Sequence, residues 1–241
     1  MRLNKFISDT GVCSRRAADS WIEDGRVTIN GAIATLGMQV ASGDEVRLDG
    51  KPLVEKPPDV YIALNKPVGI TCTTEGDVPG NIADFVAHAA RIFPIGRLDK
   101  DSEGLILLTN NGDIVNRVLR VENLHEKEYI VTVDKPVTSV FLHSMQQGVK
   151  ILGTVTRPCR TKRMPSLGPE AFNIVLTQGL NRQIRRMCST LGYRVRRLQR
   201  IRIMHIRLGE LPLGKWRTLT RGEIAELLAQ CAGLRNAAKV R

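Results

Sequence analysis

Three carboxylates lie close together in one short stretch of the sequence, at Asp99, Asp101 and Glu103. The stretch reads GRLDKDSEGLILLTNNG and leads into the apolar run 105–108, which predicts a buried strand. A strand fixes the backbone beside such a loop while the loop exposes its side chains. A carboxylate here is therefore well placed for acid, base or nucleophilic chemistry. The stretch alone favours a surface charge, because most loop carboxylates are solvated.

A glycoside hydrolase uses two carboxylates that flank the bond to be broken. One acts as a general acid and the other as a base or nucleophile. The spacing does not decide whether such a pair exists here, because alternate residues that enter a strand through a turn need not face one cleft. We expect Asp101 and Glu103 to be solvated, or to cap the loop through a side chain. The role of Asp99, which lies between Arg97 and Lys100, depends on the rest of the chain.

The other reactive residue types give no sign of a metal or redox site. The five cysteines are scattered and never spaced as CxxC, which fits reduced thiols in a cytoplasmic protein. The four histidines are isolated, so we expect no zinc site. The sequence also shows no phosphate-binding loop and no serine or cysteine triad. We therefore expect activity without a metal or cofactor.

The chain is strongly basic, with a formal net charge of +12 and a pI near 9.9. Such a charge predicts a polyanionic partner, of which nucleic acid is the first candidate. No twenty-residue apolar segment predicts a membrane span, and the start MRLNKFISD lacks the apolar core of a signal peptide. Nine arginines and no acidic residue occupy 182–207, a density that we expect to require an anionic partner. We predict a cytoplasmic, monomeric, RNA-binding protein.

Residues 1–50 are predicted to form a compact unit of two helices and a small sheet. Ser14 is a suitable N-cap for the second helix, and Asn30-Gly31 and Asp49-Gly50 are typical of hairpin turns. Basic residues gather at the helix starts, where helix N-terminal amides also favour phosphate. These residues are Arg2, Lys5, Arg15 and Arg16.

A linker is predicted at 51–59, where KPLVEKPPD is rich in proline and charge. Residues 60–241 then form the second domain. Its patterns predict strands at 60–64, 105–108, 127–133 and 171–177, and helices at 82–86, 114–119, 140–145 and 223–228, with a further helix ended by Gly192. The region 157–169 predicts loops and an edge hairpin. Periodicity alone leaves an α+β fold and a doubly wound α/β fold equally plausible.

The segment RLNKFISDTGVCSRRAADSWIEDGRVTINGAIATLGMQVASGDEV resembles the small RNA-binding module named after ribosomal protein S4. In that family the two helices and the following loop form the RNA-facing surface. The resemblance implies that Arg15 and Arg16 contact backbone phosphates. We expect Arg2, Lys5 and Ser14 on the same surface.

Four further segments, in order along the chain, resemble the motifs of pseudouridine synthases. They are NKPVGITCT at 65–73, GRLDKDSEGLILLTN at 96–110, KEYIVTV at 127–133 and GLNRQIRRM at 179–187. With the first module, the resemblance spans almost the whole chain. It is closest to the RsuA-type group, and in particular to the RluF-like synthases that act on large-subunit ribosomal RNA. Ser102 stands where the family often has threonine, which is a small polar exchange.

The resemblance implies an α+β catalytic domain with a mixed, largely antiparallel sheet flanked by helices, and no cofactor. Asp99 matches the aspartate used in breaking the base–sugar bond of uridine, either as a nucleophile or by removing a sugar proton. Tyr129 matches the tyrosine that stacks on the target base. Arg185 matches the arginine that pairs with the aspartate, and such a guanidinium would keep the carboxylate ionised and oriented.

The expected reaction is the isomerisation of a specific uridine to pseudouridine in ribosomal RNA, with transfer RNA as the second candidate. The target base must leave its stack, at a cost of a few kcal/mol that contacts with the RNA must offset. We expect these substrate contacts from Lys66, Arg97, Asn181, Arg182 and Arg186. Two alternatives stay open: an RNA-binding protein without catalysis, and a nucleoside or glycoside hydrolase.

Overall fold

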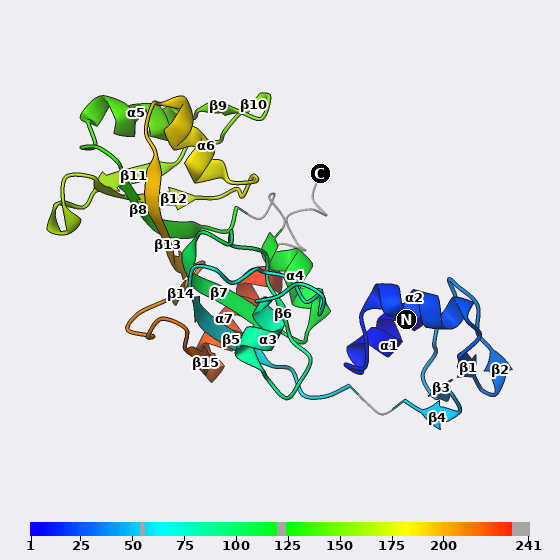
Figure 1. Ribbon diagram of the computed structural model, residues 1–241. Helices are drawn as coiled ribbons and strands as arrows, with labels where there is room; N and C mark the ends of the chain where they lie inside the picture. The colour runs from blue at the N-terminus through cyan, green and yellow to red at the C-terminus, as the bar shows by residue number, and fades with distance from the viewer. Residues whose placement is uncertain (54–55, 120–123, 233–241) are drawn as a thin grey trace. The chain divides into compact units, whose positions relative to one another are not determined.

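The computed structural model describes residues 1–53, 56–119 and 124–232 (Figure 1). The chain forms two compact units. The first unit consists of Met1–Val60 with the short segments His88–Ile92 and Asn110–Gly112, and the second unit holds Tyr61–Ala87, Phe93–Thr109 and the chain from Asp113 on. The predicted linker at 51–59 includes residues 54–55, which lie outside the described residues.

The first unit contains the predicted helices and hairpins. Its helices are α1 (Leu3–Asp9) and α2 (Arg15–Glu23), and its sheet has the order β2-β1-β3-β4, with β1 Val27–Ile29, β2 Ala32–Ile33, β3 Val46–Leu48 and β4 Lys51–Pro52. Ser14 Oγ accepts from Ala17 N at 3.1 Å, so Ser14 caps α2 as predicted. Asn30 and Gly31 both have positive φ, at 51° and 83°, as a tight hairpin turn requires.

An apolar core holds the helices of the first unit on its sheet. Leu3 and Ile7 of α1, Ala18 and Ile22 of α2, and Val27 of β1 are all at most 2% exposed. They belong to one cluster of buried side chains. Because the apolar side of each helix is used in this core, the polar side of each helix faces solvent.

The second unit is built on a nine-stranded sheet with the order β11-β12-β8-β13-β7-β5-β15, in which β14 pairs with β13 and β6 with β7. Its strands are β5 Tyr61–Lys66, β6 Phe93–Pro94, β7 Glu103–Thr109, β8 Lys127–Val133, β11 Arg160–Arg163, β12 Ala171–Leu176, β13 Val195–Ile203, β14 Ile206–Arg207 and β15 Trp216–Thr218. Among the described strands only β7 and β13 pair in parallel. The α+β prediction, with a mixed and largely antiparallel sheet, is confirmed, and the doubly wound alternative is wrong.

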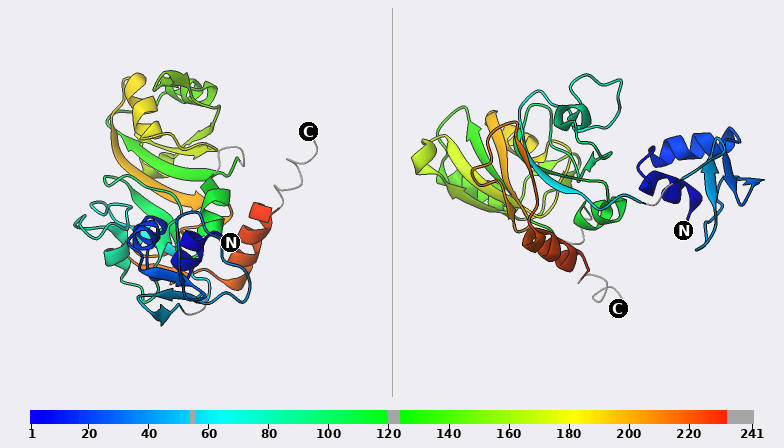
Figure 2. Two further views of the ribbon diagram at one scale, coloured as in Figure 1. Left: turned by 90° about the vertical axis from the view of Figure 1, so that its right-hand side faces the viewer. Right: turned by 90° about the horizontal axis from the view of Figure 1, so that it is seen from below.

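Helices cover the two ends of this sheet separately (Figures 1 and 2). The helices are α3 (Ile82–Val86), α4 (Gly112–Leu119), α5 (Ser139–Gln147), α6 (Gln183–Thr190) and α7 (Arg221–Ala232), with a 3-10 turn at Pro165–Leu167 and a small hairpin of β9 (Lys150–Ile151) and β10 (Thr154–Val155). Helices α5 and α6 lie at the end that holds β11 and β12, whereas α4 and α7 pack with β5 and β7 in one core. Within the described residues no helix is long and apolar enough to cross a bilayer.

Strands β5 and β7 lie in the interior of the sheet and are buried along their whole length. This burial explains their continuous apolar runs, since a strand covered on both faces needs no alternation with polar residues. Strand β8 instead alternates, with Tyr129, Val131 and Val133 buried. Both patterns agree with the strands predicted from the sequence.

Helix α7 begins with a capping box that is tied to the sheet. Thr220 N donates to Glu223 Oε2 at 2.8 Å and Glu223 N donates to Thr220 Oγ1 at 3.2 Å. Arg217 of β15 donates twice to the same carboxylate, at 2.7 Å each. These hydrogen bonds, that from Arg217 first, lower the pKa of Glu223 to about 2.

We expect Glu223→Gln to lower the free energy of unfolding by about 1–2 kcal/mol at neutral pH, because the ion pair with Arg217 is lost while the amide oxygen can still accept from Thr220 N. The folded carboxyl has a pKa of about 2 against a usual 4.5. Its contribution is therefore present above pH 4.5 and is lost as the pH falls through 2. Urea unfolding at pH 7 and pH 3 checks both points, with Trp216 as the probe in a Trp21→Phe background. Equal stability of parent and variant at pH 7 would contradict the prediction.

Candidate active site

A pocket of about 380 Å³ opens in the second unit between the loop before β7 and the turn before α6. Strands β8 and β13 form its floor, and α4 closes one side. Five of the predicted site residues line it: Arg97, Asp99, Tyr129, Asn181 and Arg182. Lys66, Arg185 and Arg186 are not among its lining residues.

Asp99 lies on the loop that joins β6 to β7, and main-chain contacts hold this loop. Gly69 N donates to Lys100 O at 2.8 Å, and Ser102 N donates to Asp99 O at 3.0 Å. Leu98 N approaches Cys72 Sγ at 3.4 Å. The Asp99 side chain is 30% exposed and forms part of the pocket wall. A carboxylate is thus fixed by its backbone and open to a ligand.

The arginine nearest to Asp99 is Arg182. Arg182 Nη1 lies 3.8 Å from Asp99 Oδ2, and the same guanidinium donates to both oxygens of Asp101, at 3.0 and 2.9 Å. The hydrogen bond from Arg182 is the main reason that the pKa of Asp101 is lowered. Asp101 is 46% exposed, as a solvated loop residue would be, and is also paired with Arg182.

Arg185 holds the end of the same loop. Its Nη2 donates to Asp101 O at 2.7 Å and to Ser102 Oγ at 3.1 Å, and its Nε lies 3.4 Å from Asp101 Oδ2. In this structure Arg185 contacts Asp101 and Ser102 of the loop, whereas the sequence predicts a pairing of Arg185 with Asp99. Arg185 lies further into α6 and reaches the start of β7, whereas Arg182 stands at the helix start with a left-handed φ of 51°.

Tyr129 has the position that the sequence predicts, on the buried and cleft-facing side of β8. It is 9% exposed and lines the pocket. Its partners in the sheet are Ile174 of β12 and Arg200 of β13, and the guanidinium carbon of Arg200 lies 6.0 Å from the ring centroid. An aromatic face in this position can stack against a planar base.

Lys66 does not occupy an open turn corner. Its side chain is fully buried at the end of β5, and Nζ donates to Pro67 O and Ile70 O, both at 2.9 Å. Burial lowers the pKa of this amine. Lys66 therefore braces residues 67–70, whose Gly69 contacts the Asp99 loop, and the expected substrate contact is wrong for this arrangement.

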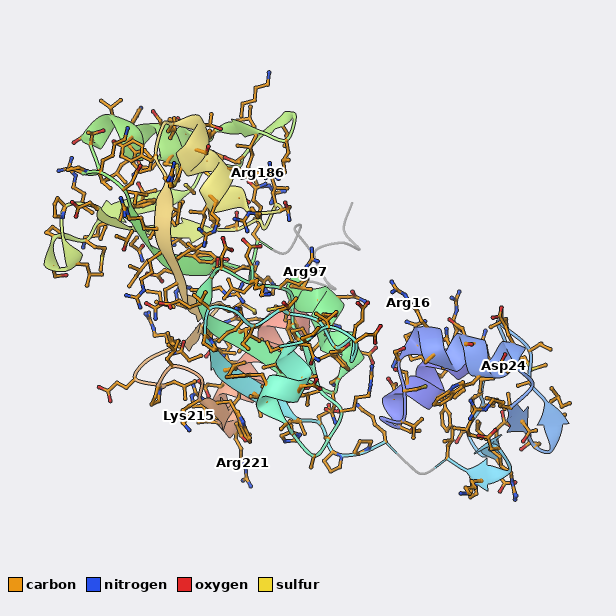
Figure 3. The ribbon with its side chains drawn as sticks, in the orientation of Figure 1. Arg16, Asp24, Arg97, Arg186, Lys215 and Arg221 are labelled. Carbon is orange, nitrogen blue, oxygen red and sulfur yellow. The ribbon has the colours of Figure 1, made fainter. Side chains whose placement is uncertain are left out.

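The other predicted substrate contacts lie at the rim. Arg97 is exposed on the loop before β7 and Arg186 is exposed on α6 (Figure 3). Arg186 donates to Asn181 O at 3.1 Å and to Asn181 Oδ1 at 3.3 Å, so it orders the turn that carries Asn181. Arg97 and Asn181 both line the pocket.

Much of the arginine charge between 182 and 207 is neutralised inside the second unit. Arg197 Nη2 lies 2.6 Å from Glu103 Oε1, and Arg202 pairs with Glu126 at 3.0 Å and with Glu128 at 2.6 Å. Glu103 is 9% exposed, so the expectation that it is solvated is wrong. Arg197 and Arg202 have their anionic partners within the unit. The exposed arginines of this stretch are Arg182, Arg186, Arg194, Arg196, Arg197 and Arg207, of which Arg182 and Arg197 are paired with carboxylates.

Two cationic residues that line the pocket, Lys127 and Arg200, are not predicted from the sequence. Lys127 could have been found, because it precedes the buried Tyr129 by two residues and a strand has a side-chain period of two. Arg200 carries no local signal. Its position depends on how β13 pairs with β8, where Arg200 lies opposite Tyr129.

The residues predicted to bind RNA in the first unit differ in their exposure to solvent and in their contacts within the unit. Arg2, Arg15 and Arg16 are exposed, and Arg16 extends from α2 into solvent (Figure 3). Lys5 is paired with Asp9 one turn along α1, and the Ser14 hydroxyl caps α2. The start of α2 thus presents two adjacent guanidinium groups.

Known proteins match both units. Residues 60–190 match the family model of the RNA pseudouridylate synthases, and residues 1–46 match that of the S4 domain. The chain is 55% identical over 240 residues to the dual-specificity RNA pseudouridine synthase RluF of Salmonella typhi, with 99% of this chain and 82% of that protein covered. It is 33% identical to the ribosomal large subunit pseudouridine synthase B of Bacillus subtilis, with 95% and 96% covered.

One solved structure is similar over almost the full length of the chain. It is a crystal structure of a pseudouridylate synthase with a TM-score of 0.68 and 32% sequence identity. The alignment covers 94% of this chain and 99% of that one.

Proposed function

The chain belongs to the RNA pseudouridylate synthase family and carries an S4 domain, and on this premise we propose that its pocket converts a specific uridine of ribosomal RNA to pseudouridine, with a transfer RNA as a second substrate. It is a pseudouridine synthase, an isomerase. The choice of RNA is supported by relatives, of which one is described as dual-specificity and another as acting on the large ribosomal subunit.

The observation that carries the proposal is a half-open carboxylate opposite an aromatic wall. Asp99 and Tyr129 line the same pocket from the loop before β7 and from β8. A flipped uracil stacked on Tyr129 would present its ribose toward the loop that holds Asp99. Flipping is required because the glycosidic bond cannot be reached while the base is stacked in RNA.

We assign the reaction at the sugar to Asp99. The C1′–N1 bond breaks and its electron pair goes to N1, while Asp99 acts on the ribose, either by attack at C1′ or by removal of the C2′ proton. The detached uracil turns and forms a bond from C5 to C1′. This bond either displaces the Asp99 carboxylate from C1′ or forms as Asp99 returns the proton to C2′. C5 then loses its proton and N1 gains one, so product and substrate have the same composition. The Tyr129 hydroxyl is the proposed acceptor of the C5 proton.

Arg182 and Arg185 have separate tasks in this proposal. Arg182, 3.8 Å from Asp99, supplies the positive charge that keeps a carboxylate ionised. Arg185 acts through the loop, because its hydrogen bonds go to Asp101 O and Ser102 Oγ. Arg185 is thus a positioning residue rather than the direct partner of the catalytic carboxylate.

Tritium release tests the function. Transcripts of ribosomal RNA and of transfer RNA, each labelled with tritium at uracil C5, are incubated with the protein, and the modified position is then mapped. Synthase activity releases the label as water and leaves the RNA chain intact. Free uracil would instead support a hydrolase, and binding of both RNAs without release of label would support a silent RNA-binding protein.

We expect the first unit to bind RNA through phosphates at the start of α2. Replacing Arg15 or Arg16 by alanine should reduce the slope of log affinity against log salt by about 1 for each phosphate that the variant no longer neutralises. Arg47→Ala is the matched control, because the Arg47 side chain is 43% exposed in the same unit and already paired with Glu45 at 2.8 Å. Filter binding at several salt concentrations gives the slopes. Slopes that match the parent for both Arg15 and Arg16 variants would rule out this binding surface.

A further inference from the structure

Arg200 is a buried arginine with an unused donor in the wall of the pocket. Its side chain is 3% exposed, Nε donates to Leu105 O at 2.7 Å, and Nη1 reaches Arg97 O at 3.5 Å. Nη2 is buried and has no hydrogen-bond partner. Buried polar groups are nearly always paired in folded proteins, so an orphaned guanidinium nitrogen beside a pocket points to a ligand.

Lys127 is a second cation on the same wall. It precedes Tyr129 by two residues in β8, and the backbone of β8 pairs with β13 through Tyr129 opposite Arg200 and Lys127 opposite Ile203. Nζ of Lys127 donates to His125 O at 3.3 Å. Within the described residues neither Lys127 nor Arg200 forms an ion pair. Burial and the neighbouring Arg200 lower the pKa of Lys127 to about 8, so this amine is still mainly protonated at pH 7.

Two unpaired cations beside one aromatic ring repel each other, and a protein gains nothing from this arrangement unless an anion joins them. The proposed reaction creates one. When C1′–N1 breaks, the electron pair remains on the base, and uracil carries a negative charge spread over N1 and its two carbonyl oxygens. The charge disappears when C5 bonds to C1′, loses its proton, and N1 gains one. The anion therefore exists only while the base is detached.

We infer that Arg200 is a further substrate-binding residue, whose free Nη2 donates to a carbonyl oxygen of the target uracil, and that Lys127 and Arg200 together stabilise the detached base as an anion. This inference rests on the proposed function, because it names the group that holds the leaving base. It assigns the two sides of the pocket to the two halves of the broken bond. Asp99 acts on the ribose, and the cations of β8 and β13 hold the base while it turns.

The test compares Lys127→Met and Arg200→Gln with the parent protein in single-turnover reactions on the RNA transcript. We expect each variant to lower the rate of uridine consumption by about 10²-fold, the usual loss when one donor to a developing anion is removed. Lys127→Arg restores the charge and should stay within about tenfold of the parent. Arg196→Met is the matched control, because Arg196 is exposed on the same strand and should change the rate less than about threefold.

A substrate with a better leaving group separates charge stabilisation from a merely structural role. Fluorine at uracil C5 withdraws electrons, so the detached base is a more stable anion. The Lys127→Met and Arg200→Gln variants should therefore lose less than about tenfold with a 5-fluorouridine target, measured as consumption of the target nucleoside. Equal losses on uridine and 5-fluorouridine would overturn the inference. If Arg200→Gln does not fold, the comparison of Lys127→Met with the parent protein still decides the test.

Failure of this inference can be told apart from failure of the proposed function. A parent protein that consumes no uridine in any transcript refutes the function, and the inference is lost with it. A fully active parent whose Lys127→Met and Arg200→Gln variants are equally active refutes the inference alone.

Discussion

Asp99→Asn lowers the rate of uridine isomerisation by about four orders of magnitude or more, the size of loss seen when the one group that performs the chemistry is removed. An amide has nearly the shape of a carboxylate but is neither a nucleophile nor a base, so attack at C1′ and removal of the C2′ proton both fail. RNA affinity should change little. The Asp99 side chain is 30% exposed and its nearest cation is 3.8 Å away, so we also expect the fold to persist.

Single-turnover tritium release measures this loss, and Asp101→Asn is the matched control. Asp101 stands two residues further along the same loop and binds Arg182, so its replacement disturbs position without removing the reacting group. We expect about a tenfold reduction for it. Asp99→Ala belongs beside Asp99→Asn, because deamidation would return asparagine to aspartate. More than about 1% of parental activity in both Asp99 variants, or equal losses at Asp99 and Asp101, would show that the chemistry lies elsewhere.

The parts of the fold and site that the sequence predicts correctly are those with a local signal. The buried run in β7, the alternation in β8 and the Ser14 cap depend on neighbouring residues alone. The alternation in β8 places the Tyr129 side chain on the buried side of the strand. For the same reason the pocket contains Asp99, whose loop directly precedes β7.

The errors and omissions concern contacts between segments that lie far apart in the chain. Which arginine of α6 reaches Asp99 depends on where the helix starts against the loop, and the left-handed residue Arg182 shifts that start. Arg200 enters the pocket only because β13 runs parallel to β7 and antiparallel to β8. Periodicity cannot reveal such a mixed pairing, so it does not distinguish this fold from the doubly wound alternative.

The arginine-rich stretch combines structural and binding roles that composition cannot separate. Arg197 and Arg202 neutralise carboxylates within the unit, whereas Arg200 of the same strand lines the pocket. A count of arginines therefore overestimates the surface available to RNA. The register of each residue decides which role it has.

Gly104→Ala should lower the free energy of unfolding of the second unit by at least about 3 kcal/mol. Gly104 is the second residue of β7 and has a φ of +102°. Any residue other than glycine is strained in this backbone conformation. A Cβ atom there would lie 2.3 Å from Arg200 O and 2.7 Å from Arg200 N. The obstacle is the backbone of β13, so no side chain can rotate to make room.

Urea unfolding followed through Trp216, in a Trp21→Phe background, measures this change. Gly76→Ala is the matched control, because Gly76 belongs to the same unit and a Cβ there meets no atom within 4 Å. We expect the control to stay within about 0.5 kcal/mol of the parent. A Gly104→Ala protein within about 1 kcal/mol of the parent would contradict the close approach of β7 and β13.

The same substitution connects the stability of the sheet with the chemistry of the pocket. Gly104 pairs with Arg200 in the parallel ladder, and Arg200 Nε donates to the carbonyl of the next residue, Leu105. A methyl group at Gly104 must push the two strands apart, which moves the guanidinium away from Tyr129. Where Gly104→Ala still folds at low temperature, its rate should therefore fall on uridine by about as much as that of Arg200→Gln, and less on 5-fluorouridine. A rate equal to the parent's would show that Arg200 need not be held in this position.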